Sequence, residues 1–304
     1  MEKTINILLF LLILSFVQTQ LSEQEKQNLL KKNLKINNIT NPEILFSSVK
    51  SNAVKKNPKY DPEKIKEIII KYNFPENYSF IDDLNPPIRI KKLSYGENDF
   101  AFASTTALSY RLFKKGIDIE LSAYYLITCY DKSGYTESDN LGIEFFLVKY
   151  GTVTEECIPS RARYVQMAIK ECPSECYFDD DEFKKYRAKN PYSTTLQYKN
   201  DYYEVIAIIM EQLVSQGPVW STIINYNDFK DLKGEKCSNI IYKEGENSIH
   251  LGRNAVVIVG YGYQDNKYYW IVQNFLGKAF CDNGFAKIEF GEINIEEVAF
   301  SEPY

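Results

Sequence analysis

Residues 254–274, NAVVIVGYGYQDNKYYWIVQN, decide the fold class of this chain. The stretch contains two β-branched or aromatic runs, at 255–259 and 268–272, with a polar turn between them. Similar runs occupy 219–224 and 285–290. Short runs of this composition, separated by turns, are typical of β-strands. We therefore expect the chain to form a sheet from residue 219 onward.

Residues 98–217 have a helical pattern. Asn98 and Asp99 are expected to cap a helix that runs to Lys115 and stops at Gly116. Further helices are predicted at 122–127, 140–150 and 202–215. Helices first and strands second indicate an α+β protein of two packed lobes. A groove between the lobes would be the natural place for a site.

The N-terminal part has the pattern of targeting and pro-segments. Lys3 and the apolar run Ile7–Val17 predict a signal peptide over 1–20, since the run is shorter than the roughly 20 residues of a membrane span. A retained anchor is the alternative. Residues 21–75 are rich in Lys and Asn and predict a pro-segment-like extension, with a helix starting at Asp61 and Pro62. The main domain is then 76–304, and we expect it to be soluble after signal cleavage, outside the cell or in a lysosome or vacuole.

Composition excludes several classes of partner. The net charge of −5 comes without a basic stripe, so we expect no nucleic acid partner. One histidine and a single close cysteine pair argue against a metal site, and we expect no cofactor. Six cysteines behind a signal peptide predict disulfides. Asn38 and Asn77 begin glycosylation sequons that fit the same route.

A series of motifs then resembles the papain family of cysteine peptidases. Asn98–Ala103 resembles the family's Ser-Cys-Trp-Ala-Phe-Ser, and Asn254–Val256 its His-Ala-Val. The remaining matches, in order and at family spacing, are Glu120–Cys129, Gln216–Val219, Val259–Gly262, Tyr269–Asn274 and Asp282–Phe285. The resemblance covers 74–304. It implies a papain-like fold, with a helical left lobe and a β-barrel-like right lobe, preceded by a pro-segment.

Within that family the chain is most similar to the cathepsin B-like branch. Thr154–Cys157, Cys172–Cys176 and Tyr186–Asn190 carry this resemblance. It implies that Cys129 pairs with Cys172 and that Cys157 pairs with Cys176. Cys237 and Cys281 have no family counterpart. They form either an additional bridge, which we favour, or two free thiols.

The same alignment of motifs places unexpected residues at the catalytic positions. Asp99 stands at the nucleophile position, Asn254 at the base position and Leu93 at the oxyanion donor, while the orienting asparagine is retained as Asn274. A cysteine peptidase needs a thiolate and an adjacent imidazole, and neither Asp nor Asn supplies one. The single histidine, His250, lies four residues before Asn254, about 13 Å away in extended chain.

The substrate-facing wall also departs from the family pattern. The family's Gly-Cys-Asn-Gly-Gly corresponds here to 134–138, so that Thr136, Glu137 and Ser138 replace its last three residues. The side chains of Glu137 and Ser138 are expected to crowd the cleft where glycines would let a peptide backbone approach.

The expected function is that of a catalytically inactive cathepsin B-like homologue. It would be a monomer that binds a peptide or protein ligand, or a structural or storage protein for which only the fold matters. The alternative is an active cysteine-type peptidase with an unorthodox centre. A fluorogenic peptide assay separates these readings.

Overall fold

The computed structural model describes residues 60–82, 84, 99–130, 140–159, 171–178, 181–195, 202–234, 237, 239–292 and 297–304. All of them belong to one compact unit. The expected signal peptide, most of the pro-segment, the sequon at Asn38, Leu93 and the wall residues Thr136, Glu137 and Ser138 lie outside the described residues.

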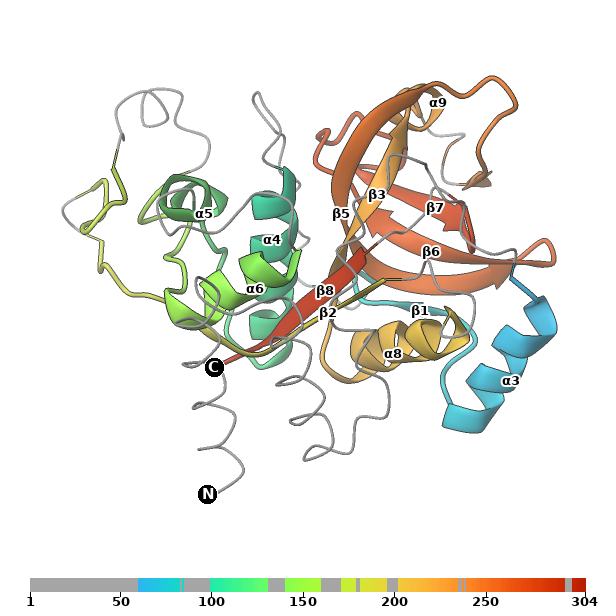
Figure 1. Ribbon diagram of the computed structural model, residues 1–304, viewed down its shortest axis with the longest axis horizontal. Helices are drawn as coiled ribbons and strands as arrows, with labels where there is room; N and C mark the ends of the chain where they lie inside the picture. Colours follow the sequence, from blue (N-terminus) through green and yellow to red (C-terminus); the bar gives the residue numbers. More distant parts are fainter. Residues whose placement is uncertain are drawn as a thin grey trace, which may run out of the picture. The chain divides into compact units, whose positions relative to one another are not determined.

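Eight strands form one sheet in the order β2-β8-β3-β5-β6-β7-β4, and β1 pairs separately with β5 (Figure 1). All strand pairs are antiparallel except β4 with β7. The strands are β1 (Tyr78–Ser79), β2 (Ala188–Thr195), β3 (Val219–Tyr226), β4 (Ile241–Tyr242), β5 (His250–Gln264), β6 (Lys267–Gln273), β7 (Phe285–Glu289) and β8 (Glu297–Pro303).

Strand β5 separates two hydrophobic cores. Successive side chains of a strand point to opposite faces. Val256 and Ile258 therefore enter the core of the barrel lobe, while Val257 and Val259 enter the core of the helical lobe. The unbroken apolar run of β5 follows from this burial on both faces. The stretch that decides the fold class thus also joins the two lobes.

The helical lobe is built from α4 (Asp99–Lys114), α5 (Ala123–Tyr130) and α6 (Asn140–Lys149) (Figure 1). Helix α4 is its centre and contacts α5, α6 and strands β3, β5 and β8. The helix ends as the sequence predicts, since Gly116 takes a φ of 82° and Ile117 N–H returns to Leu112 O at 3.0 Å. A side chain at Gly116 would be strained at that φ.

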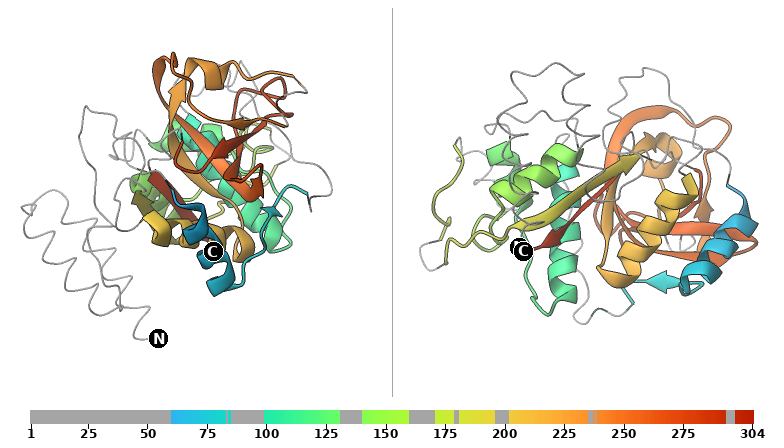
Figure 2. Two further views of the ribbon diagram at one scale, coloured as in Figure 1. Left: turned by 90° about the vertical axis from the view of Figure 1, so that its right-hand side faces the viewer. Right: turned by 60° about the horizontal axis from the view of Figure 1, so that its bottom comes forward.

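Two further helices cover the barrel lobe. Helix α8 (Tyr202–Ser215) buries Val205, Ile209 and Leu213 in the barrel core. Helix α3 (Pro62–Tyr72) contacts α8 and adds Ile65 and Ile69 to the same core (Figure 2). The short helix α9 (Asn227–Lys230) follows β3.

One part of the helical prediction is wrong. Residues 188–195, inside the range predicted as helical, form strand β2, which pairs with β8. Nothing in the local sequence, AKNPYSTT, has a strand's alternation of apolar and polar residues. The strand forms because β8 offers it an edge for pairing. In the described part of the chain, no helix combines the length and apolar character needed to cross a bilayer.

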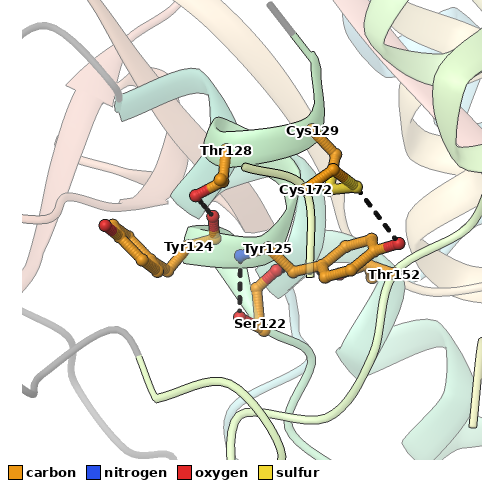
Figure 3. Close-up of a disulfide and its surroundings, with 7 residues drawn as sticks. All are labelled: Ser122, Tyr124, Tyr125, Thr128, Cys129, Thr152 and Cys172. Atoms are coloured by element: carbon orange, nitrogen blue, oxygen red, sulfur yellow. Dashed lines mark hydrogen bonds between the residues drawn. A yellow bond between two sulfur atoms is a disulfide. The ribbon is translucent and has the colours of Figure 1, made fainter. Parts of the chain in front are cut away.

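Three disulfides join Cys129 to Cys172, Cys157 to Cys176 and Cys237 to Cys281. The first two are the pairs that the resemblance implies, and the third is the bridge that the sequence left open. Around the first (Figure 3), Tyr125 Oη lies 3.7 Å from Cys172 Sγ. Ser122 Oγ begins α5 by accepting a hydrogen bond from Tyr125 N–H at 3.0 Å.

Candidate active-site position

Asp99 lies where the start of helix α4 meets strand β5. Its Oδ1 accepts a hydrogen bond from Phe100 N–H at 2.9 Å, and its Oδ2 accepts one from Ala255 N–H at 2.6 Å. Ala255 is 3% exposed, so its N–H depends on this carboxylate for a partner. The side chain at the predicted nucleophile position therefore ties the helical lobe to the central strand.

Asn254 and Asn274 form the second contact of the site. Asn274 Oδ1 accepts hydrogen bonds from Phe275 N–H at 2.7 Å and from Asn254 Nδ2 at 3.2 Å. Because a backbone N–H can only donate, the Asn274 atom must be its oxygen, and Asn254 must present its NH₂ group. The Asn254 side chain thus donates to the orienting asparagine, as the N–H of an imidazole could.

Asn274 is held in place by burial. It is 1% exposed and lies directly after β6, where its own N–H donates to Gly284 O at 2.9 Å. Its Nδ2 has no hydrogen-bond partner among the described residues. The structure thus brings three of the four predicted catalytic positions, those of Asp99, Asn254 and Asn274, to the meeting point of α4, β5 and β6.

Asp99, Asn254 and Asn274 have neither a thiol nor an imidazole beside them. All six cysteines of the chain are in disulfides, so no thiol is present. The only histidine, His250, is exposed at the first residue of β5 and stacks edge-on against Tyr226 at 6.1 Å between ring centroids. It lies on the same extended strand as Asn254, about 13 Å along it. A carboxylate and two amides can exchange hydrogen bonds, but the amides cannot take up a proton near neutral pH.

A buried pair behind the site was not predicted from sequence. Tyr110, on α4, donates its hydroxyl to Gln273 Oε1 at 2.6 Å. Burial raises the pKa of Tyr110 well above its ordinary value, and the bond to Gln273 offsets only part of this rise. The hydroxyl therefore stays protonated. Gln273 precedes Asn274, so the pair fixes the end of β6 against α4.

Buried polar contacts tie the same helix to the sheet. Arg111 Nε donates to Pro218 O at 2.8 Å, and Glu144 Oε1 accepts from Trp220 Nε1 at 2.5 Å. Burial lowers the pKa of Arg111 to about 10, although nearby Glu144 acts in the opposite direction. Burial likewise raises the pKa of Glu144. These contacts join α4, α6 and β3, and no motif in the sequence predicted them.

The remaining predicted site residues are known from the sequence alone. Leu93 and the three wall residues lie outside the described residues, so their roles stay predictions. Among the residues that the structure does describe, no group of three metal-ligating side chains comes together. Asn77, the second predicted glycosylation residue, is described and exposed.

The family model of the papain family cysteine proteases matches residues 89–302. The chain belongs to the papain family. Its match begins before α4 and ends within β8, so both lobes of the fold belong to the matched region.

Relatives place this papain-family chain in the cathepsin B-like branch. It is 28% identical over 209 residues to Cathepsin B-like CP1 of Giardia intestinalis, which covers 66% of this chain and 64% of that protein. It is 24% identical over 208 residues to Cathepsin B of Dictyostelium discoideum, covering 65% of this chain and 63% of that protein. The chain therefore spans just under two thirds of the length of these two relatives.

A solved structure agrees with this fold. ProCathepsin B S9 from Trypanosoma congolense superposes with a TM-score of 0.63 at 18% identity, and covers 93% of this chain and 99% of that one. Together with the cathepsin B-like relatives, the three disulfides indicate a protein of the secretory route or the lysosome.

Proposed function

We propose that this protein is a non-catalytic member of the cathepsin B-like branch that binds a peptide or protein ligand. The observation that carries the proposal is that every sulfur of its six cysteines is in a disulfide. A papain-family reaction begins with the attack of a thiolate. A chain without a thiol has no such nucleophile anywhere, whichever position is considered.

The groups at the old catalytic position support the same conclusion. Both oxygens of Asp99 accept backbone N–H groups, so the carboxylate acts as a structural acceptor. Asn254 donates to Asn274 and cannot serve as a general base. The contacts of Asp99 and Asn254 hold the lobes together. Such contacts serve a scaffold that binds a ligand, and they supply no group that hydrolysis needs.

Activity is tested with a fluorogenic dipeptide substrate on the secreted protein, with and without a thiol-directed epoxide inhibitor. We expect no turnover above that of the Asp99→Ala variant, with active cathepsin B as the positive control. A thiol titration of the folded chain should find no reactive group. Turnover that the epoxide abolishes would overturn the proposal.

Restoring the family residues tests how far the scaffold has departed from an enzyme. The variant Asp99→Cys, Asn254→His, Leu93→Gln supplies nucleophile, base and oxyanion donor by type. We expect little activity from it, because Glu137 and Ser138 still stand where the family has glycines. Efficient turnover by the triple variant would mean that the substrate wall is intact.

Binding is tested with an immobilised library of extended peptides. We expect saturable binding of a subset of peptides, weakened by Asn254→Tyr, which fills the half-exposed end of the site. Asp118→Tyr, on the exposed turn after α4, is the matched control. If no peptide binds, or if both variants bind like the wild type, a storage or structural role replaces the proposed one.

A further inference from the structure

The glycosylation sequon Asn77-Tyr78-Ser79 lies at the start of the sheet. Asn-x-Ser with x other than proline is the acceptor sequence for N-linked glycans in secreted proteins. Tyr78 and Ser79 form strand β1, which pairs with Tyr261 and Gly260 of β5. The structure therefore describes every residue of this sequon.

The side-chain amide of Asn77 is fixed through its oxygen. Asn77 Oδ1 accepts a hydrogen bond from Tyr263 N–H at 2.8 Å. The same oxygen lies so close to Gly262 that a Cβ added there would be 2.6 Å away. Asn77 is nevertheless exposed, and its Nδ2 has no acceptor within hydrogen-bond distance among the described residues. A glycan on Nδ2 would leave the bond to Tyr263 intact, because Oδ1 is not altered.

The hydroxyl of the sequon's serine, Ser79, is buried in the folded chain. Ser79 Oγ is buried and has no partner among the described residues. Phe80 N–H bonds Val259 O at 2.9 Å, and a Cβ added at Gly260 would lie 2.3 Å from Tyr78 O. An enzyme that must bind the asparagine and the hydroxyl of one sequon together cannot reach this hydroxyl once β1 is paired.

We propose that Asn77 carries an N-linked oligosaccharide that is added before β1 pairs with β5. The donor is a lipid-linked oligosaccharide pyrophosphate. The bond from Asn77 Nδ2 to the first sugar carbon forms, the bond from that carbon to the pyrophosphate oxygen breaks, and Nδ2 loses one proton as the lipid pyrophosphate leaves. The folded sheet then holds the glycan base through Tyr263 N–H. This proposal does not rest on the proposed function.

Occupancy is tested on the full chain expressed in a eukaryotic secretory cell line. The variant Asn38→Gln removes the other sequon of the chain and should still carry one glycan. An amidase that releases the glycan and converts Asn77 to aspartate identifies its position. Adding Ser79→Ala should abolish that glycan while keeping Asn77 and its bond to Tyr263. Adding Asn77→Gln, which removes the acceptor asparagine itself, should also abolish it. A secreted Asn38→Gln protein without a glycan at Asn77 would overturn the proposal.

The order of the two events is tested with unglycosylated protein made in a bacterial periplasm. Oligosaccharyltransferase and lipid-linked donor should modify Asn77 in the reduced, denatured chain and give no measurable product on the folded one. Equal modification of both forms would show that the sheet does not seal the sequon. An unglycosylated acceptor peptide of matched sequence serves as the positive control for the enzyme.

Discussion

Replacing Asp99 with alanine should destabilise the fold, although the sequence predicts this position to be that of a catalytic nucleophile. The change removes the acceptor of the N–H of Ala255, a residue that is 3% exposed. An unsatisfied buried donor costs about 1–3 kcal/mol. Loss of a carboxylate from the first turn of a helix adds about 0.3–1 kcal/mol. Together the two terms amount to about 1–4 kcal/mol, and we expect the free energy of unfolding to fall by about 2–3 kcal/mol, near the middle of that range.

Urea unfolding followed by tryptophan fluorescence measures this loss. With a denaturant dependence of about 2–3 kcal/mol per molar, the midpoint should move down by about 1 M. The variant Asp118→Ala is the matched control, because Asp118 is an exposed aspartate just beyond the end of the same helix. Its effect should stay within about 0.5 kcal/mol.

Two further substitutions separate charge from geometry. Asp99→Asn keeps one carbonyl oxygen, so one of its two backbone donors keeps a partner, and we expect about half of the loss. Asp99→Cys offers only a weak sulfur acceptor and should behave like alanine. If Asp99→Ala unfolds at the same urea concentration as Asp118→Ala, the contact between α4 and β5 does not stabilise the fold and the reasoning fails.

Three other predictions concern stability. Burial raises the pKa of Glu144 above its ordinary 4.5, so in this pH range the folded chain holds a proton that the unfolded chain releases. The free energy of unfolding should therefore fall as the pH rises above 4.5. The variant Glu144→Gln should reduce this pH dependence in urea titrations at about pH 4.5 and 7.5, and an unchanged dependence would contradict the prediction. Ile65→Ala, at a position 0% exposed, should cost about 2–5 kcal/mol, whereas Ile70→Ala, 70% exposed on the same helix, should be nearly neutral by thermal unfolding. Replacing Cys237 and Cys281 together by alanine opens a loop of 44 residues and should cost about 4 kcal/mol in denaturant, while an unchanged midpoint would mean that the bridge adds nothing.

The sequence predicted the parts of the fold that carry local signals. The apolar run of β5 and the turn before β6 mark a hairpin without any knowledge of the rest of the chain. Helix α3 begins at Pro62 because Asp61 caps it, with Asp61 Oδ1 accepting Glu63 N–H at 3.1 Å. Such signals act within a few residues, and the structure places these elements within two or three residues of the expected bounds, except that β5 (His250–Gln264) extends beyond the predicted 255–259 at both ends.

The parts that sequence reasoning missed depend on distant partners. The bond from Ala255 N–H to Asp99 spans 156 positions, and the bond from Tyr110 to Gln273 spans 163. No spacing rule connects residues so far apart, since only the folded chain brings them together. Strand β2 was missed for the same reason, because its pairing is supplied by β8 at the end of the chain.

The residues at the predicted nucleophile and base positions, Asp99 and Asn254, both take part in hydrogen bonds that hold the fold together. Asn254 donates a hydrogen bond to Asn274, so its side chain joins β5 to the residue that follows β6. An aspartate at 99 does more than fill space, because its carboxylate accepts an N–H from the residue after Asn254. A thiol at that position would accept this bond poorly. The substitution Asp99→Cys should therefore weaken the contact that holds helix α4 against strand β5. A thiol nucleophile at this position and the stability of this fold would then make opposing demands on one side chain.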